Sequence, residues 1–260
     1  MRKPARRFLE YDICCAFDRS GQGKRVLAQH NRQVKLQPHR DRPSQRSLWI
    51  AQQVRRFQAS PSTPLDKEGL RKVLQSFLLV GFNSTEYDLP MIQLALKGYT
   101  TEELKDASDD IIVRGLRARD FSEKHGIDRH YWNHIDLIQV APLKASLKTY
   151  AGRLHCQKMQ DLPIDPDAEI TAEEAGILVE YCGNDLQNTI ILREELDGQI
   201  KLRMELSERY EVDLRSKSDA QTAERIIALE VKKITGIHPQ RPQGLEGKKY
   251  KYQIPGLREV

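Results

Sequence analysis

Two acidic residues of this chain lie where a carboxylate is costly to bury. Asp88 follows the apolar run Phe77-Leu-Leu-Val-Gly-Phe82, and Asp185 falls on the apolar stripe of a helical stretch. A partly buried carboxylate is stable only when another group neutralises it or donates hydrogen bonds to it. Carboxylate oxygens are ligands that Mg²⁺ and Mn²⁺ prefer. We therefore expect Asp88 and Asp185 to converge on a site for divalent metal ions.

A tyrosine accompanies the second of these acids. Tyr181 precedes Asp185 by four positions, so on a helix the two side chains share one face. A phenol beside a metal-binding carboxylate can orient or deprotonate a water molecule. Asp88 comes from a strand end, where catalytic groups often lie in open sheets. Paired Mg²⁺ ions suit phosphoryl chemistry, because one activates water and the other stabilises the leaving oxygen. These residues predict a phosphodiester substrate.

The charge of the chain is unevenly distributed. Its net charge is +5, but residues 22–64 hold nine Lys or Arg residues against a single acid, Asp41. Such a segment suits a polyanion such as nucleic acid. It is equally typical of a solvated loop or variable insertion, and the two interpretations are compatible.

Composition excludes several classes of protein. No apolar run approaches the roughly 18 residues that span a bilayer, so we expect no membrane partner. The basic start is followed by an apolar stretch that Glu10 and Asp12 interrupt, which argues against a signal peptide. The four cysteines show no metal-type spacing and indicate free thiols in a reducing cytoplasm.

Local patterns predict strands alternating with helices, which is typical of an α/β or α+β sheet with flanking helices. Asp88 is expected to cap its helix and Gly98 to end it, and Thr101 to cap the next one. Thr171 and Glu174 form a capping-box pattern before the clearest helix. The predicted strands are 8–17, 77–82 and 134–140; the predicted helices are 66–76, 88–98, from 101 onward, 146–154, from 171 onward, 199–210 and 213–235; residues 22–64 and 114–134 are predicted to be irregular.

The same residues resemble the motifs of a known family. Asn83 to Asp88 match Asn-x-x-x-(Phe/Tyr)-Asp, and Tyr181 to Asp185 match Tyr-x-x-x-Asp, the second and third motifs of DEDD-type 3′–5′ exonucleases of the tyrosine subclass. These are the proofreading domains of DNA polymerases. The intervening Asp136-Leu137 and Ser146-Leu-Lys148 are similar to segments that the family often has between the two motifs.

Longer stretches extend the resemblance. Residues 145–155 and 159–163 resemble the exonuclease regions of bacteriophage polymerases, and residues 214–221 resemble a segment that follows the exonuclease in such proteins. The resemblance covers about residues 70–235. It implies a ribonuclease-H-like mixed sheet flanked by helices, in a domain spanning 65–212. An N-terminal strand and basic insertion (1–64) would precede it, and a helical extension with a basic tail (213–260) would lead towards a polymerase-like region.

The resemblance also implies roles for individual residues. Asp185 would ligate the metal that binds the attacking water, Tyr181 would orient that water, and Asp88 would hold the second metal. Asn83, Tyr87 and Lys148 would lie on the substrate side. The cofactors would be two Mg²⁺ or Mn²⁺ ions. The partners would be the 3′ end of single-stranded DNA and a polymerase domain or replication proteins, in the cytoplasm of a bacterium or a phage-infected host.

The first motif of the family, Asp-x-Glu on the first strand, is not found. If Asp12 is the expected acid, Cys14 occupies the place of the glutamate, and a thiolate is a poor ligand for Mg²⁺. Alternatively residues 12–17 are the family's second strand and the first strand lies upstream, which is the interpretation we favour from sequence.

Asp136 could be a strand-end cap or an acid near the metals. Because the first motif is not found, we expect either a 3′–5′ exonuclease that is truncated or impaired, or a catalytically inactive nucleic-acid-binding module with the same fold. A ribonuclease or transposase-type relative is a third hypothesis.

Overall fold

The structure is a computed structural model that describes residues 10–16, 24–31, 54–59, 65–128, 132–165, 168 and 171–240. The chain divides into two compact units, Met1–Asp219 and Ala220–Val260. The first unit extends beyond the predicted domain end at residue 212, and it includes the strands of the first 64 residues. The part of the predicted basic tail that follows residue 240 lies outside the described residues.

The first unit is built on a mixed five-stranded sheet with the strand order β3-β2-β1-β4-β5. β1 pairs antiparallel with β2, β2 pairs antiparallel with β3, and β4 is parallel to both β1 and β5. Asp12 is opposite Val80 in the register, and Gly81 is opposite Asp136. The carboxyl ends of β4 and β5 therefore meet at one edge of the sheet. The strands are β1 (Glu10–Ala16), β2 (Lys24–Asn31), β3 (Val54–Ala59), β4 (Leu78–Gly81) and β5 (His134–Asp136).

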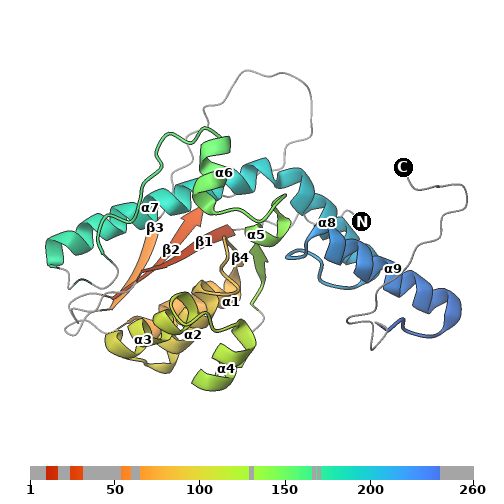
Figure 1. Ribbon diagram of the computed structural model, residues 1–260, viewed down its shortest axis with the longest axis horizontal. Coiled ribbons are helices and arrows are strands. Elements are labelled where there is room, and N and C mark those ends of the chain that lie inside the picture. The colour runs from red at the N-terminus through yellow and green to blue at the C-terminus, as the bar shows by residue number, and fades with distance from the viewer. Residues whose placement is uncertain are drawn as a thin grey trace, which may run out of the picture. The chain divides into compact units, whose positions relative to one another are not determined.

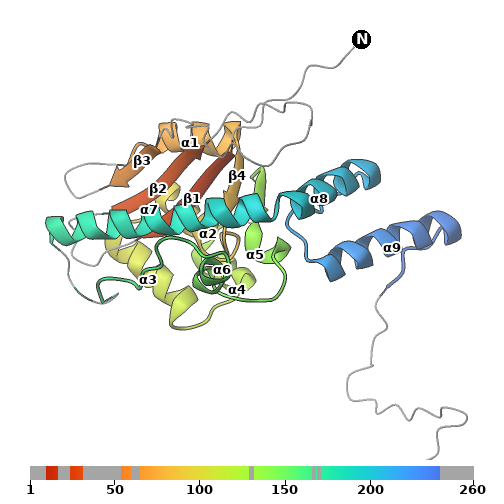
Figure 2. The same ribbon diagram turned by 90° about the horizontal axis from the view of Figure 1, so that it is seen from above.

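Helices follow and separate the parallel strands, which confirms the general α/β class. Figure 1 shows α1, α2 and α3 on one side of the sheet and α7 along the other, and Figure 2 shows α7 crossing the strands. The helices are α1 (Lys67–Ser76), α2 (Asp88–Lys97), α3 (Thr101–Ile112), α4 (Ala118–His125), α5 (Leu137–Val140), α6 (Leu147–Arg153), α7 (Ala172–Glu195), α8 (Asp197–Tyr210) and α9 (Asp219–Thr235).

Strand β4 is buried on both faces, as expected of a strand between parallel neighbours. Because successive side chains point to opposite faces, Leu79 packs in one cluster with α1, α2 and α3, while Leu78 and Val80 pack in another with α6, α7 and α8. The two clusters hold helices against both faces of the sheet. The end of β4 is therefore a rigid platform for the loop that follows.

Several local predictions are confirmed. Thr171 and Glu174 form the predicted capping box at the start of α7, and Gly98 ends α2 with a left-handed backbone at φ 103°. Two predicted caps are wrong by one residue. The N-cap of α2 is Tyr87, so Asp88 is the first helical residue, and the capping box of α3 begins at Thr100 rather than Thr101.

Other predictions are corrected by pairing and packing between distant segments. The predicted loop over 22–64 contains β2 and β3, whose hydrogen bonds to β1 and to each other carry no local signal. The predicted irregular stretch 114–134 contains α4, which has only one buried side chain, Phe121, and so lacks an apolar period. The predicted strand 134–140 turns into α5 after Asp136.

Candidate functional site

The loop that carries the first of the two motifs, residues 82–87, leaves β4 through a tight turn. Asn83 has a left-handed backbone with φ 57°, a conformation that Asn tolerates better than most residues. Ser84 is fully buried, and a Cβ on Gly81 would lie 2.6 Å from its Cβ. Only glycine therefore fits at position 81 without moving the loop. The side chain of Asn83 is exposed to solvent.

Asp136, at the end of β5, anchors this loop. Its Oδ1 accepts a hydrogen bond from the Asn83 amide at 2.8 Å, and its Oδ2 accepts one from the Thr85 amide at 2.9 Å. Oδ1 also accepts from the amide of Ile138 at 3.4 Å, which caps α5. The Asp136 side chain is 1% exposed. Both carboxylate oxygens are thus engaged by backbone amides, so Asp136 is a strand-end cap that also shapes the neighbouring loop.

His134 makes a second contact to the same loop. Its Nε2 lies 2.7 Å from the Ser84 hydroxyl. Burial lowers the pKa of His134 to about 4, although the negative charge of Asp136 acts in the opposite direction. The ring is therefore neutral at pH 7, as a buried partner of a serine hydroxyl should be.

Asp88 lies directly after this loop, in the first turn of α2. Asp88 is 7% exposed. An ionised carboxylate is favourable in the first turn of α2, because the helix dipole is positive at the amino end of the helix. The preceding Tyr87 packs against the cluster of α1, α2 and α3, and its hydroxyl lies 2.9 Å from the Ser108 hydroxyl. Its predicted contact with substrate stays a prediction. Helix α2 contacts β1, the strand of Asp12.

The second motif lies on α7, which contacts β1 and β2. Tyr181 and Asp185 are both half-buried, one helical turn apart. Burial raises the pKa of Asp185, while a hydrogen bond from the side chain of Tyr181 and the positive charge of Lys148 act to lower it. The net direction is upward, so the charged form of Asp185 is incompletely compensated by its protein neighbours. A cation bound to Asp185 would compensate this negative charge.

Lys148 reaches this pair from a different helix. It lies on α6, which contacts α7, and its exposed ammonium group forms an ion pair with Asp161. Its charge is close enough to Asp185 to lower the pKa of that carboxyl. The fold thus brings together three predicted site residues, Lys148, Tyr181 and Asp185. The predicted approach of Asp88 to Asp185 stays a prediction; α2 and α7, which carry them, both contact β1.

The donor chemistry of the site fits a hard cation. Asp88 and Asp185 offer carboxylate oxygens, and a dication beside Asp185 would offset the burial that raises its pKa. Within the part of the chain that the structure describes, no three His, Cys, Asp or Glu residues are grouped so as to hold a metal. The side chain of Asp12 lies outside that part. Asp88, Asp185 and the predicted Asp12 are the residues that would hold the ions.

Sequence reasoning missed part of the support around this site. The contact between His134 and Ser84 and the amide contacts of Asp136 join segments about fifty residues apart. The only local signal was a polar residue at each end of a short apolar strand. Ser216, whose hydroxyl accepts a hydrogen bond from the Asp136 amide at 2.9 Å, lies in the segment 214–221 noted for its resemblance, but nothing in the sequence placed it beside Asp136.

Comparison with known proteins adds no relative: no protein-family model, curated protein or solved structure matches the chain. Among the described residues, no helix has the length and apolar character needed to cross a membrane.

Proposed function

We propose that this chain is a metal-dependent 3′–5′ exonuclease of DNA with a ribonuclease-H-like fold. The observation that carries the proposal is the environment of Asp185. This carboxylate shares one face of α7 with Tyr181. Its pKa is raised by burial, although the hydrogen bond from Tyr181 and the positive charge of Lys148 act to lower it. An acid whose pKa is raised by burial, with a tyrosine hydroxyl bonded to it and a lysine charge acting on it, is a candidate for a functional site.

The order of the strands supports the proposed fold. Three antiparallel strands are followed by two that run parallel to the first, in the order β3-β2-β1-β4-β5, as expected for a ribonuclease-H-like sheet. In such a sheet the first strand lies beside the fourth. Here β1 itself pairs with β4, with Asp12 opposite Val80. The pairing leaves no place between them for a missing upstream strand, and it favours Asp12 as the acid of the first motif, with Cys14 in the place of the glutamate.

Each residue then has a task in phosphodiester hydrolysis. Asp185 and Asp88 would hold the cations, and the hydroxyl of Tyr181 would position the attacking water for in-line displacement. Lys148 is exposed and attracts the phosphate, and the exposed Asn83 meets the terminal nucleotide. The bound ions would supply Lewis-acid activation of water and neutralise the leaving oxygen. Asp136 and His134 hold the loop of Asn83 in place and do not react.

The test is digestion of single-stranded DNA labelled at its 3′ end, with Mg²⁺ or Mn²⁺ and the full chain. Wild type should release labelled nucleotides, and both Asp185→Ala and Asp88→Asn should release them at least about 100-fold more slowly. Glu195→Gln is the matched control, because it removes an exposed carboxylate from the same helix α7. It should match wild type.

The outcomes separate the alternatives. Release by Asp185→Ala at the wild-type rate would show that the site is wrongly assigned. Faster release from a matched RNA strand would favour a ribonuclease. If wild type binds the DNA strand but releases nothing with either metal, the chain is the inactive nucleic-acid-binding module, and Cys14 in place of a glutamate explains the loss.

A further inference from the structure

The segment between α8 and α9, residues 213–218, is tied to the end of β5. The Asp136 amide donates to the Ser216 hydroxyl at 2.9 Å, and that hydroxyl lies 3.4 Å from the His134 carbonyl. Arg215 donates to the side chain of Asn133, the residue before β5, and forms an ion pair with Asp213 at 2.8 Å. We refer to residues 213–218 as the linker segment. It holds both ends of β5 although it is distant in sequence.

Contacts with α8 hold the linker segment in place. Leu214 is fully buried, and its amide donates to the Ser207 hydroxyl of α8 at 2.9 Å. Arg203 is 2% exposed; it donates to the carbonyl of Lys217 at 2.8 Å and pairs with Asp219 at 2.6 Å. A buried arginine that binds a backbone carbonyl holds that backbone in one place. The contact of the linker segment with β5 is therefore supported by buried contacts with α8.

These contacts continue into the candidate site. Ser216 holds the backbone of Asp136, whose carboxylate holds the amides of Asn83 and Thr85, and that loop ends at Asp88. His134 holds Ser84 in the middle of the same loop. Contacts thus run from the linker segment through β5 to Asn83, Ser84 and Thr85, and the Ser84 carbonyl accepts a hydrogen bond from the amide of Leu89, in the first turn of α2, at 2.9 Å.

We propose that Ser216 is a positioning residue for the candidate site: docking of the linker segment on β5 sets the loop from Asn83 to Asp88, and the rate at the site depends on it. This inference rests on the proposed exonuclease function. Ser216 touches neither substrate nor metal in this proposal, and it acts only through Asp136.

The first test compares three variants of the full chain by steady-state kinetics on a single DNA strand. Ser216→Ala leaves the buried Asp136 amide without its acceptor, and we expect kcat to fall about 10-fold with KM unchanged. Ser216→Thr keeps a hydroxyl and should restore most of the rate. Ser207→Ala is the matched control, because it removes the other serine contact of the linker segment without touching β5. Its kcat should stay within about twofold of wild type after correction for any unfolded fraction.

A second test does not depend on activity. Hydrogen exchange of the Asn83 and Thr85 amides should be about 10-fold faster in Ser216→Ala than in wild type, and unchanged in Ser207→Ala. Equal losses of kcat in the two alanine variants, or unchanged exchange in Ser216→Ala, overturn the proposal. If wild type has no nuclease activity, the proposed function fails, and the exchange result alone decides whether the linker segment controls the loop.

Discussion

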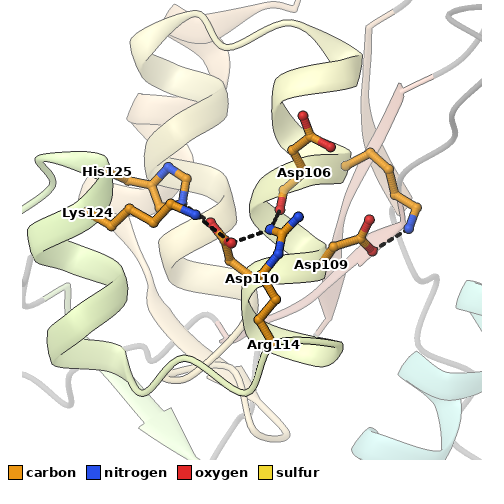
Figure 3. A network of polar contacts seen from close by, with 7 residues as sticks. Asp106, Asp109, Asp110, Arg114, Lys124 and His125 are labelled. Atoms are coloured by element: carbon orange, nitrogen blue, oxygen red, sulfur yellow. Dashed lines mark hydrogen bonds and ion pairs between the residues drawn. The ribbon is translucent and has the colours of Figure 1, made fainter.

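Two acids of this molecule, Asp110 and Asp185, are held in opposite electrostatic states. Asp110 is 1% exposed between α3 and α4 and is surrounded by basic groups (Figure 3). Its Oδ1 pairs with Lys124 at 2.6 Å and with Arg114, and its Oδ2 lies 2.8 Å from His125 Nε2. Burial alone would raise the pKa of Asp110, but the hydrogen bonds from these three residues lower it to about 2.

Among the residues that the structure describes, Lys148 is the cation whose charge acts on Asp185, and Lys148 is also paired with Asp161. Its pKa is raised by burial. The difference shows that burial of an acid does not by itself mark a site. The acid whose charge is already neutralised holds two helices together, whereas the acid whose charge is not neutralised is suited to bind a cation from solution.

The sharpest test of this contrast is Asp185→Asn. We expect nuclease activity to fall at least about 100-fold, because a ligand of the metal is lost. We expect stability in the absence of metal to rise, because the folded pKa of Asp185 lies above its unfolded value and the ionised acid therefore opposes folding at pH 7. Thermal unfolding in a chelator measures this effect. A lower melting temperature than that of Glu195→Gln would contradict the contrast.

Asp110→Ala should have the opposite pattern. Removing the acid leaves three basic groups without their partner, and we expect a loss of about 2–3 kcal/mol in the free energy of unfolding. Activity per folded molecule should be retained. Asp106→Ala, on the exposed side of the same helix, is the control and should change stability by less than about 0.5 kcal/mol. Urea unfolding separates the two, and equal losses would show that the network contributes nothing.

Stability should fall in two pH windows, for two different reasons. His134 has a folded pKa of about 4, below its unfolded 6.5, so the unfolded chain takes up a proton first and stability falls as the pH drops from 6.5 to 4. Asp110 has a folded pKa of about 2, below 3.8, so its contribution is present above 3.8 and is lost towards pH 2. Each slope should be at most about 1.4 kcal/mol per pH unit.

Two variants test which residue causes each window. The free energy of unfolding of each variant is measured by urea titration across the pH range. His134→Gln should flatten the first window and leave the second. Asp110→Asn should do the reverse. The assignment fails if both variants keep both slopes.

The smallest effect is expected for Lys148→Met. The charge of Lys148 lowers the pKa of Asp185, so its loss should move the acid limb of the pH–rate profile to higher pH. Because Lys148 is exposed and screened by solvent, the rate on that limb should fall by no more than about fivefold. Lys144→Met removes an exposed lysine four residues earlier and should leave the profile in place. An unshifted limb in Lys148→Met would separate Lys148 from the site.

The predictions that the structure confirms depend on residues close together in the chain. The capping box from Thr171 to Glu174 and the left-handed stop at Gly98 involve contacts within one helical turn. The pairing of Tyr181 with Asp185 is also a spacing of four on one helix. Propensity, capping and helical period act over this range, so these features are determined by the local sequence.

Only the tertiary structure shows which residues hold the loop of the candidate site in place. The contact from Asn83 to Asp136 spans 53 residues, and the contact from Asp136 to Ser216 spans 80. The place of β2 and β3 in the sheet likewise depends on partners far along the chain. The sequence by itself determined which residues could do chemistry and which short elements carry them. Their neighbours were decided by the fold, because a hydrogen bond between distant segments forms only after packing has brought the segments together and leaves no pattern in either one.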